Sequence, residues 1–284
     1  MPKVGIVTDT TSCVPPELVK EYDIHIVPVG LVIGGQHYKD TDLTNDEFWQ
    51  LFYAVNGATT TTAASPGDFA SIFEELSKST DNIVCIVVSK ALSATFEAAT
   101  QGRETVKGIK PGVNIEVVDS KTAAGALGFI VMEAARAARN GKSLKEVVQV
   151  ANDMIPRVKF ITAMNTLKYL VRTGRAPKTA VIGDLLGVKP IIGMVSNTGL
   201  VENLGRVRGK QKSLVKIAEL AKQHIEPGKK VHAMFHYTDG IAAGETLRDI
   251  ITSQIDCDEV YLTPYTPVMA SATGPVVAFA FYSD

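Results

Sequence analysis

Cysteine is scarce in this chain. Its 284 residues include three cysteines, Cys13, Cys85 and Cys257, which lie far apart in the sequence. Three scattered thiols are too few for a disulfide framework and too widely spaced for a zinc site built on cysteine. We therefore expect neither a small disulfide-stabilised fold nor a domain organised around such a zinc site.

Excess charge and long hydrophobic runs are also missing. The formal net charge is −1, which gives no electrostatic reason to expect a nucleic-acid partner. The longest candidate run, residues 122–132, stops at Glu133, short of the roughly 18 residues that a membrane helix needs. The opening residues, Met1-Pro2-Lys3 and a short apolar run, do not match a signal peptide. We expect a cytoplasmic protein with no nucleic-acid partner and no stable membrane insertion.

The loops of common nucleotide-binding and hydrolytic enzymes are absent too. No G-x-G-x-x-G follows the first predicted strand, and the chain has neither a G-x-x-x-x-G-K-[ST] loop nor a G-x-S-x-G elbow. Hydroxyl groups and arginines are present without an obvious base or nucleophile pairing. This combination favours a non-catalytic protein that holds a carboxylate. A nucleotide-dependent phosphotransfer enzyme that uses the same hydroxyls stays open as the alternative.

Metal ligands in a usable arrangement are equally few. Asp9, Asp119 and Asp184 are candidate metal carboxylates, but aspartates at strand ends commonly cap turns. His232 and His236 fall on a predicted strand and its exit, where four residues span about 13 Å, too far for one ion to bind both. We therefore expect no metal, and no cofactor apart from a bound ligand.

Short apolar runs alternate with amphipathic stretches through the first half of the chain, as in proteins with parallel α/β units. Hydrophobic residues make up 45% of the sequence and charged residues 21%, the balance of a globular protein. Capping signals at Thr44, Ser65 and Ser143 predict helix starts. We expect strands in this half at 4–7, 24–33, 83–88 and 115–118.

The rhythm of the sequence changes near residue 158. Beyond it we expect a hairpin turn at Asn197-Thr198-Gly199. The strands expected here are 159–163, 188–195, 231–235, 260–262 and 276–282, and the helices are 167–172, 210–224 and 241–253. We predict an α/β protein of one domain with two lobes. Residues 1–158 form a mostly parallel sheet flanked by helices, and residues 159–284 form an α+β lobe with a mixed sheet.

Four consecutive threonines, residues 59–62, stand just before the helix start at Ser65-Pro66 in "ATTTTAASPGDF". A helix N-terminus with hydroxyl groups beside it is a natural place to hold an anion. A β-branched strand or loop without a ligand is the alternative interpretation of the same run. Thr61 and Thr62 are the candidate ligand-binding residues in this stretch.

Three predicted strands end in hydroxyl-bearing turns, at Thr8-Asp9-Thr10, Ser89 through Ser93, and Asp119-Ser120. In open parallel sheets, ligands bind in the crevice outside the carboxyl ends of the strands. The convergence of these turns strengthens the hypothesis of an anion site and adds Ser93 to it.

Arginine supplies a countercharge in Arg172-Thr173-Gly174-Arg175. An arginine pairs well with a carboxylate, and Gly174 allows a backbone shape that could turn Arg175 inward. A solvated arginine after a helix C-terminus is the alternative. The basic stretch 205–212 is either a solvated face or a docking surface for an acidic or phosphorylated partner.

With these segments in order, the chain resembles the DegV family of bacterial fatty-acid-binding proteins over nearly its whole length. The motifs that carry the resemblance are "VTDTTSCVPPE", "TTAASPGDF", "VSKALSATFEAA", "VVDSKTAAGALG", "LKYLVRTGRAPK", "LLGVKPII" and "ENLGRVRGKQKSL". Each motif is weak alone, and their order and spacing together make the likeness specific.

The resemblance implies two α/β lobes with a long acyl chain buried between them. The hydroxyls that hold the carboxylate in the family fall on Thr61, with Thr62 as its neighbour, and on Ser93, and the family arginine falls on Arg175. Family members carry a fatty acid and present it to a separate ATP-dependent kinase for acyl-phosphate formation. Ala272 stands where the family commonly has a histidine, so lipid binding is expected here and presentation to a kinase is left open.

Overall fold

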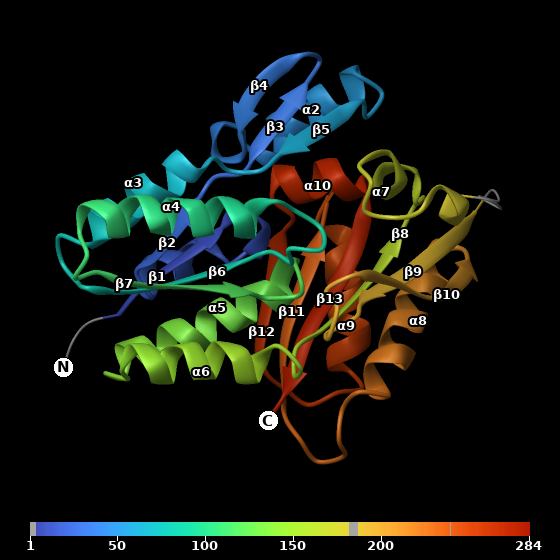
Figure 1. Cartoon of the computed structure of the whole chain (residues 1–284). Coiled ribbons are helices and arrows are strands. Elements are labelled where there is room, and N and C mark those ends of the chain that lie inside the picture. The colour runs from blue at the N-terminus through green and yellow to red at the C-terminus, as the bar shows by residue number, and fades with distance from the viewer. Residues whose placement is uncertain (1–3, 182–186, 239) are drawn as a thin grey trace.

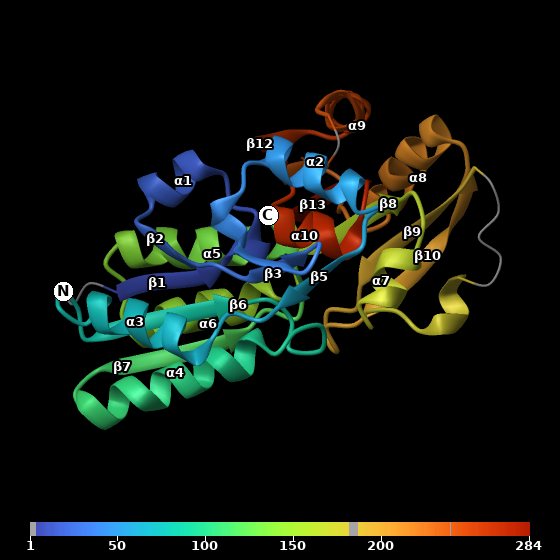
Figure 2. The same cartoon turned by 90° about the horizontal axis from the view of Figure 1, so that it is seen from above.

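The computed structural model describes residues 4–181, 187–238 and 240–284, which form two large sheets and one small sheet with helices around them (Figures 1 and 2). Sheet A has four parallel strands in the order β2-β1-β6-β7. Its strands are β1 (Val4–Asp9), β2 (Ile24–Val27), β6 (Asn82–Val87) and β7 (Asn114–Asp119).

Sheet A is parallel because helices return the chain over its faces, and its central strands are apolar on both sides. Val7 and Cys85 contribute to the core with α3 (Pro66–Leu76) and α4 (Thr95–Ile109). Ile6 and Val84, one residue along, contribute to the core that contains α5 (Ala124–Arg139) and α6 (Leu144–Met154). Figure 1 shows these two helix pairs above and below the sheet.

Sheet C is mixed and has six strands in the order β10-β9-β8-β13-β11-β12, with β11 and β12 parallel and the other pairs antiparallel. Its strands are β8 (Lys159–Met164), β9 (Val188–Met194), β10 (Val201–Arg208), β11 (Val231–Tyr237), β12 (Cys257–Pro264) and β13 (Val276–Ser283). Helices α8 (Lys210–Lys222) and α9 (Ala242–Thr252) share a core with one face of the sheet, and α5 packs on the other.

The third sheet, sheet B, is small and antiparallel, and it carries the threonine run. It consists of β3 (Gly30–Ile33) between β4 (Gln36–Lys39) and β5 (Thr59–Thr62). The remaining elements are α1 (Pro16–Glu21), α2 (Asn45–Ala54), α7 (Lys168–Arg172), α10 (Pro267–Thr273) and the 3-10 turns Thr10–Ser12, Asp40–Asp42 and Lys178–Val181.

The single strand expected at 24–33 is wrong. The chain leaves sheet A after β2, and β3 belongs to sheet B. Pro28 has no N–H to donate to a ladder, and the N–H of Val29 donates to Thr10 Oγ1 at 3.2 Å instead of to a strand. The break therefore redirects the chain and creates the sheet that holds Thr61 and Thr62.

The expected fold class is confirmed: the chain is α/β, with parallel sheet A and mixed sheet C. The capping boxes at Thr44, Ser65 and Ser143 are also present as expected. The proposed division at residue 158 falls between α6 and β8, and it stays a proposal, since α5 contacts strands of both large sheets.

A buried carboxylate fastens sheet B to α10. Asp40 follows β4, and its Oδ1 accepts the backbone N–H of Val268 at 2.7 Å in the first turn of α10. Burial raises the pKa of Asp40 to about 7, with nearby Asp9 contributing in the same direction. The pKa of Asp9, which is also buried, is raised by the same cause.

The stability of this junction should depend on pH. An aspartate with an unfolded pKa of 3.8 and a folded pKa of about 7 holds a proton in the folded protein that the unfolded chain has lost. The free energy of unfolding should therefore fall as pH rises through this window, by at most about 1.4 kcal/mol per pH unit for each such group. Thermal denaturation between pH 5 and 8 should show a flatter pH dependence in Asp40→Asn than in the parent. Asp46→Asn, which changes an exposed carboxylate on α2, should keep the parental slope, and equal slopes in all three proteins would contradict the assignment.

Candidate functional site

One cavity contains all the ligand-binding residues that the sequence predicts. Thr61, Thr62, Ser93 and Arg175 all line it, and it encloses about 760 Å³ of space free of protein atoms, its open mouth included. The lining residues come from sheets B and C, from α7 and α10, and from turns that include those following β6 and α7.

Thr61 lies on β5, where it pairs with Leu31 of β3. Its hydroxyl oxygen accepts a hydrogen bond from Arg175 Nη2 at 3.2 Å. A threonine hydroxyl has one donor and two acceptor positions. Because this bond uses an acceptor position, the hydrogen of Thr61 is left to donate to an acidic group in the cavity.

Arg175 is directed at the cavity by the turn after α7. Gly174 has φ +76°, in the left-handed region that favours glycine, as the sequence predicts for this position. The guanidinium also donates from Nε to the Leu92 carbonyl at 3.1 Å and from Nη1 to the Thr173 carbonyl at 3.0 Å. Burial lowers the pKa of Arg175, and an arginine stays cationic in proteins nevertheless. All three of these acceptors are uncharged oxygens, and within the described part of the chain no carboxylate pairs with the guanidinium.

Ser93 lies in the turn before α4. Its Oγ is 2.8 Å from Thr95 Oγ1 and accepts the backbone N–H of Thr95 at 3.3 Å, which fixes the hydroxyl at the start of the helix. The same turn holds Arg175 through the Leu92 carbonyl. Arg175 is therefore hydrogen-bonded both to Thr61 and to the residue that precedes Ser93.

Most of the other strand-end polar groups have structural partners. Asp9 accepts the N–H groups of Thr11 and Val88, at 2.8 and 2.9 Å. Asp119 accepts those of Lys90 and Lys121, each at 3.1 Å. The three turns are neighbours, and Ser93 is the hydroxyl residue of these segments that lines the cavity. The two carboxylates cap turns, as the alternative interpretation proposed.

Most of the remaining cavity wall is apolar. Phe160 and Ala123 line it. Phe129 is fully buried in the core against Tyr282. Phe96 lies under Lys90, and neither phenylalanine is part of the described lining. Sequence reasoning missed the lining residues from the second half of the chain, namely Thr162, Leu170, Ile192, Met194, Val201, Tyr265, Val268, Met269 and Thr273.

Ala272 also lines this cavity, whereas the candidate histidines and the described candidate aspartates do not. His232 contacts Glu259 and Asp284, and His236 is buried and accepts the Gly125 N–H at 2.9 Å, with burial lowering its pKa to about 3. Asp184 lies outside the described residues. Within the described ranges no cluster of three potential metal ligands occurs, and no described helix combines the length and apolarity needed to cross a bilayer.

The chain is similar in sequence to proteins of a known family. A family model described as an uncharacterised protein of the DegV family matches residues 3–284. A DegV domain-containing protein of Caldanaerobacter subterraneus is 37% identical over 75% of this chain and 75% of its own. One from Lactococcus lactis is 30% identical over 96% of both chains.

Solved structures of the same kind resemble the whole chain. One described as "Fatty Acid Binding of a DegV family Protein from Thermus thermophilus" is 28% identical, with a TM-score of 0.89 and coverage of 99% of this chain and 100% of that one. A Thermotoga maritima protein, described as revealing a fatty acid binding function, has a TM-score of 0.89 at 22% identity and complete coverage of both chains, and at this identity it supports the fold alone.

The turn that aims Arg175 can be tested through its glycine. Gly174→Ala should lower the free energy of unfolding by roughly 1–2 kcal/mol, because alanine is strained at φ +76° although its Cβ would meet no atom within 4 Å. Gly108→Ala in α4 is the matched control, since its Cβ also meets nothing, and it should raise the free energy of unfolding by roughly 0.5–1 kcal/mol. Urea denaturation measures both, and the same sign of change in the two variants would contradict the role given to Gly174.

Proposed function

Because the chain belongs to the DegV family, we propose that it binds a long-chain fatty acid in the cavity between its sheets and is not itself an enzyme. The observation that carries the proposal is that Thr61, Ser93 and Arg175 lie together at one apolar cavity. The carboxylate would contact these three residues, with Thr62 beside them. The acyl chain would extend along the apolar wall.

The polar end of the cavity has the chemistry that a buried carboxylate requires. A carboxylate without partners in an apolar site is costly, so hydrogen-bond donors and a positive charge must compensate. The Thr61 hydrogen is available, and Arg175 holds a charge whose protein partners are neutral oxygens. A fatty acid headgroup supplies the missing negative charge.

The apolar end supplies most of the affinity. Val88 from the turn after β6 and Ile192 and Met194 from sheet C lie on its wall. Leu170 from α7 and Val268 from α10 lie there too. At about 0.8 kcal/mol per buried methylene, a chain of 14 methylenes gains roughly 11 kcal/mol. This is an upper bound, because association itself costs several kcal/mol. The headgroup contacts then determine the direction in which the chain is bound.

The comparisons support the same ligand class. The Thermus thermophilus protein, at 28% identity, is described by its fatty acid binding. Less similar structures of the same fold are described with vaccenic acid and with stearic acid. A C14–C18 acid is therefore the first class of ligand to test on this chain.

Presentation of the bound acid to a separate ATP-dependent kinase is the further role we propose for such a carrier. Arg206 and Arg208 on β10 and Lys212 on α8 form part of the basic stretch that could contact a partner. Ala272, at the family histidine position, lines the cavity without a titratable group. Any phosphoryl transfer would thus proceed without a histidine at that position.

Native mass spectrometry of the recombinant protein tests the proposed function directly. A gently purified sample should retain a bound mass that matches a C14–C18 fatty acid, and solvent extraction should release it. A protein that carries no such mass, and that binds no added C14–C18 acid, would overturn the proposal.

The alternative, a nucleotide-dependent phosphotransfer enzyme, has less support from the site. Asp9 and Asp119, the carboxylates it would use for magnesium, already accept backbone N–H groups. Thermal stabilisation by ATP with magnesium, absent with a fatty acid, would favour this alternative.

Removing the two hydroxyls should weaken binding without unfolding the protein. Thr61→Val together with Ser93→Ala removes two donors to the carboxylate, and at about 1.4 kcal/mol per tenfold in affinity the loss should be roughly 10- to 100-fold. Competition with a fluorescent fatty acid measures the affinity, and thermal denaturation checks the fold. Thr60→Val with Ser71→Ala removes two hydroxyls from exposed positions on β5 and α3 and should bind like the parent. Equal affinity in the two double variants would exclude the assigned headgroup site.

A further inference from the structure

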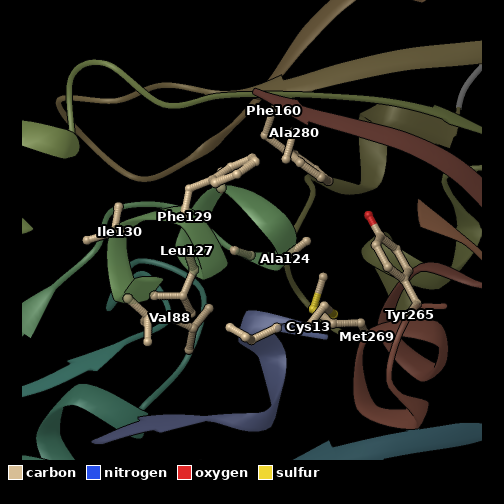
Figure 3. Close-up of a cluster of buried hydrophobic side chains, with 14 of the residues drawn as sticks. Cys13, Val88, Ala124, Leu127, Phe129, Ile130, Phe160, Tyr265, Met269 and Ala280 are labelled. Carbon is tan, nitrogen blue, oxygen red and sulfur yellow. The ribbon is translucent and has the colours of Figure 1, made fainter. Parts of the chain in front are cut away.

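Tyr265 places a polar group on the apolar wall of the cavity. It follows β12, its side chain is only 1% exposed, and it is among the lining residues. Its hydroxyl has no hydrogen-bond partner among the described residues. Figure 3 shows the phenol oxygen directed away from Met269, toward the side on which Phe160 and Ala280 lie.

An unpartnered phenol in this position is unfavourable for the protein alone. A buried hydroxyl without a hydrogen bond loses its contacts with water and gains none in exchange. Phenylalanine would fill the same space without that loss. Burial, above all, raises the pKa of Tyr265 well above its ordinary value, so the group is a neutral hydrogen-bond donor at physiological pH.

Thr162 on β8 offers a matching acceptor. Its side chain also lines the cavity, and its proximity to the phenol lowers the pKa of Tyr265, against the larger effect of burial, although the two hydroxyls do not form a hydrogen bond. Thr162 Oγ1 donates its own hydrogen to the Val277 carbonyl at 3.0 Å. The threonine oxygen therefore has acceptor capacity left for a ligand, and the tyrosine has a hydrogen to donate.

The other hydroxyls of the cavity wall already donate to the protein or belong to the headgroup end. Thr11 donates to Asp9, and Thr273 donates to the Met269 carbonyl at 2.9 Å. Ser93 is bonded to Thr95, and Thr61 accepts from Arg175. Tyr265 and Thr162 thus form a second polar position on a wall that is otherwise apolar.

We propose that the cavity is suited to a hydroxylated acyl chain, whose mid-chain hydroxyl accepts a hydrogen bond from Tyr265 and donates one to Thr162. This inference rests on the proposed function and specifies its substrate class. A hydroxyl both accepts and donates, so it can form one hydrogen bond with Tyr265 and another with Thr162 at the same time. A plain acyl chain offers the tyrosine hydroxyl no acceptor of its own.

A panel of stearic acids tests the inference on the full-length protein after removal of bound lipid. Stearic acid and its monohydroxy derivatives, with the hydroxyl at successive positions along the chain, are compared by displacement of a fluorescent fatty acid. At least one mid-chain isomer should bind about tenfold more tightly than stearic acid, and isomers hydroxylated elsewhere should bind no better than it. Sites that hydrogen-bond a ligand hydroxyl discriminate strongly against ligands that lack it.

Tyr265→Phe removes the donor while keeping the ring. In this variant the ratio of affinities for the preferred isomer and for stearic acid should fall to about one or below. Tyr38→Phe is the matched control, because it removes a phenol that donates to Gln36 outside the cavity, and it should keep the parental ratio. Thermal denaturation of both variants confirms that they are folded.

The outcomes separate this inference from the proposed function. If stearic acid binds and no hydroxylated isomer binds more tightly, or if the preference survives in Tyr265→Phe, the inference is overturned and fatty acid binding stands. If no acid of the panel binds to the parent protein, both are overturned.

Discussion

The hydrogen bond between Arg175 and Thr61 connects the two halves of this chain at the position where a charged headgroup would lie. Arg175 comes from the turn after α7, and Thr61 comes from sheet B, 114 residues earlier. This bond fixes the positions of both side chains. It leaves the positive charge of Arg175 and the hydroxyl hydrogen of Thr61 available to a ligand. The proposed recognition of a carboxylate depends on this arrangement, because a buried anion needs both a countercharge and a donor.

Helix α5 and the Asp40 contact hold the surfaces that carry these residues. The small residues of α5 allow close approach to its neighbours: a Cβ on Gly125 would lie 2.5 Å from His236 Nε2, and one on Gly128 would lie 2.7 Å from the Ser12 carbonyl oxygen. Asp40 joins sheet B to α10 at the other side of the cavity. The walls are thus part of packed elements, which favours a preformed apolar pocket over one that assembles around its ligand.

Tyr265 and Arg175, the two polar side chains discussed for this pocket, differ in their hydrogen bonding to the protein. Arg175 makes three hydrogen bonds to neutral oxygens and keeps its charge for a ligand. Tyr265 has no partner for its hydroxyl among the described residues, in a region of otherwise apolar wall. The first polar position matches the headgroup of a fatty acid, and the second is the basis for proposing an oxygenated chain.

Local sequence signals by themselves determined the type of most helices and strands, the capping boxes, the conformation at Gly174, and, through the order of the family motifs, the set Thr61, Thr62, Ser93 and Arg175. These depend on residues close together in the chain or on short motifs. Only the tertiary structure decided that the stretch 24–33 divides between two sheets, that Phe129 lies in the core and not at the cavity, and that Ile192, Met194 and Tyr265 form its wall. Those features arise from contacts between distant segments, and a side chain on a buried strand has the same sequence pattern whether it faces a neighbouring helix or a ligand.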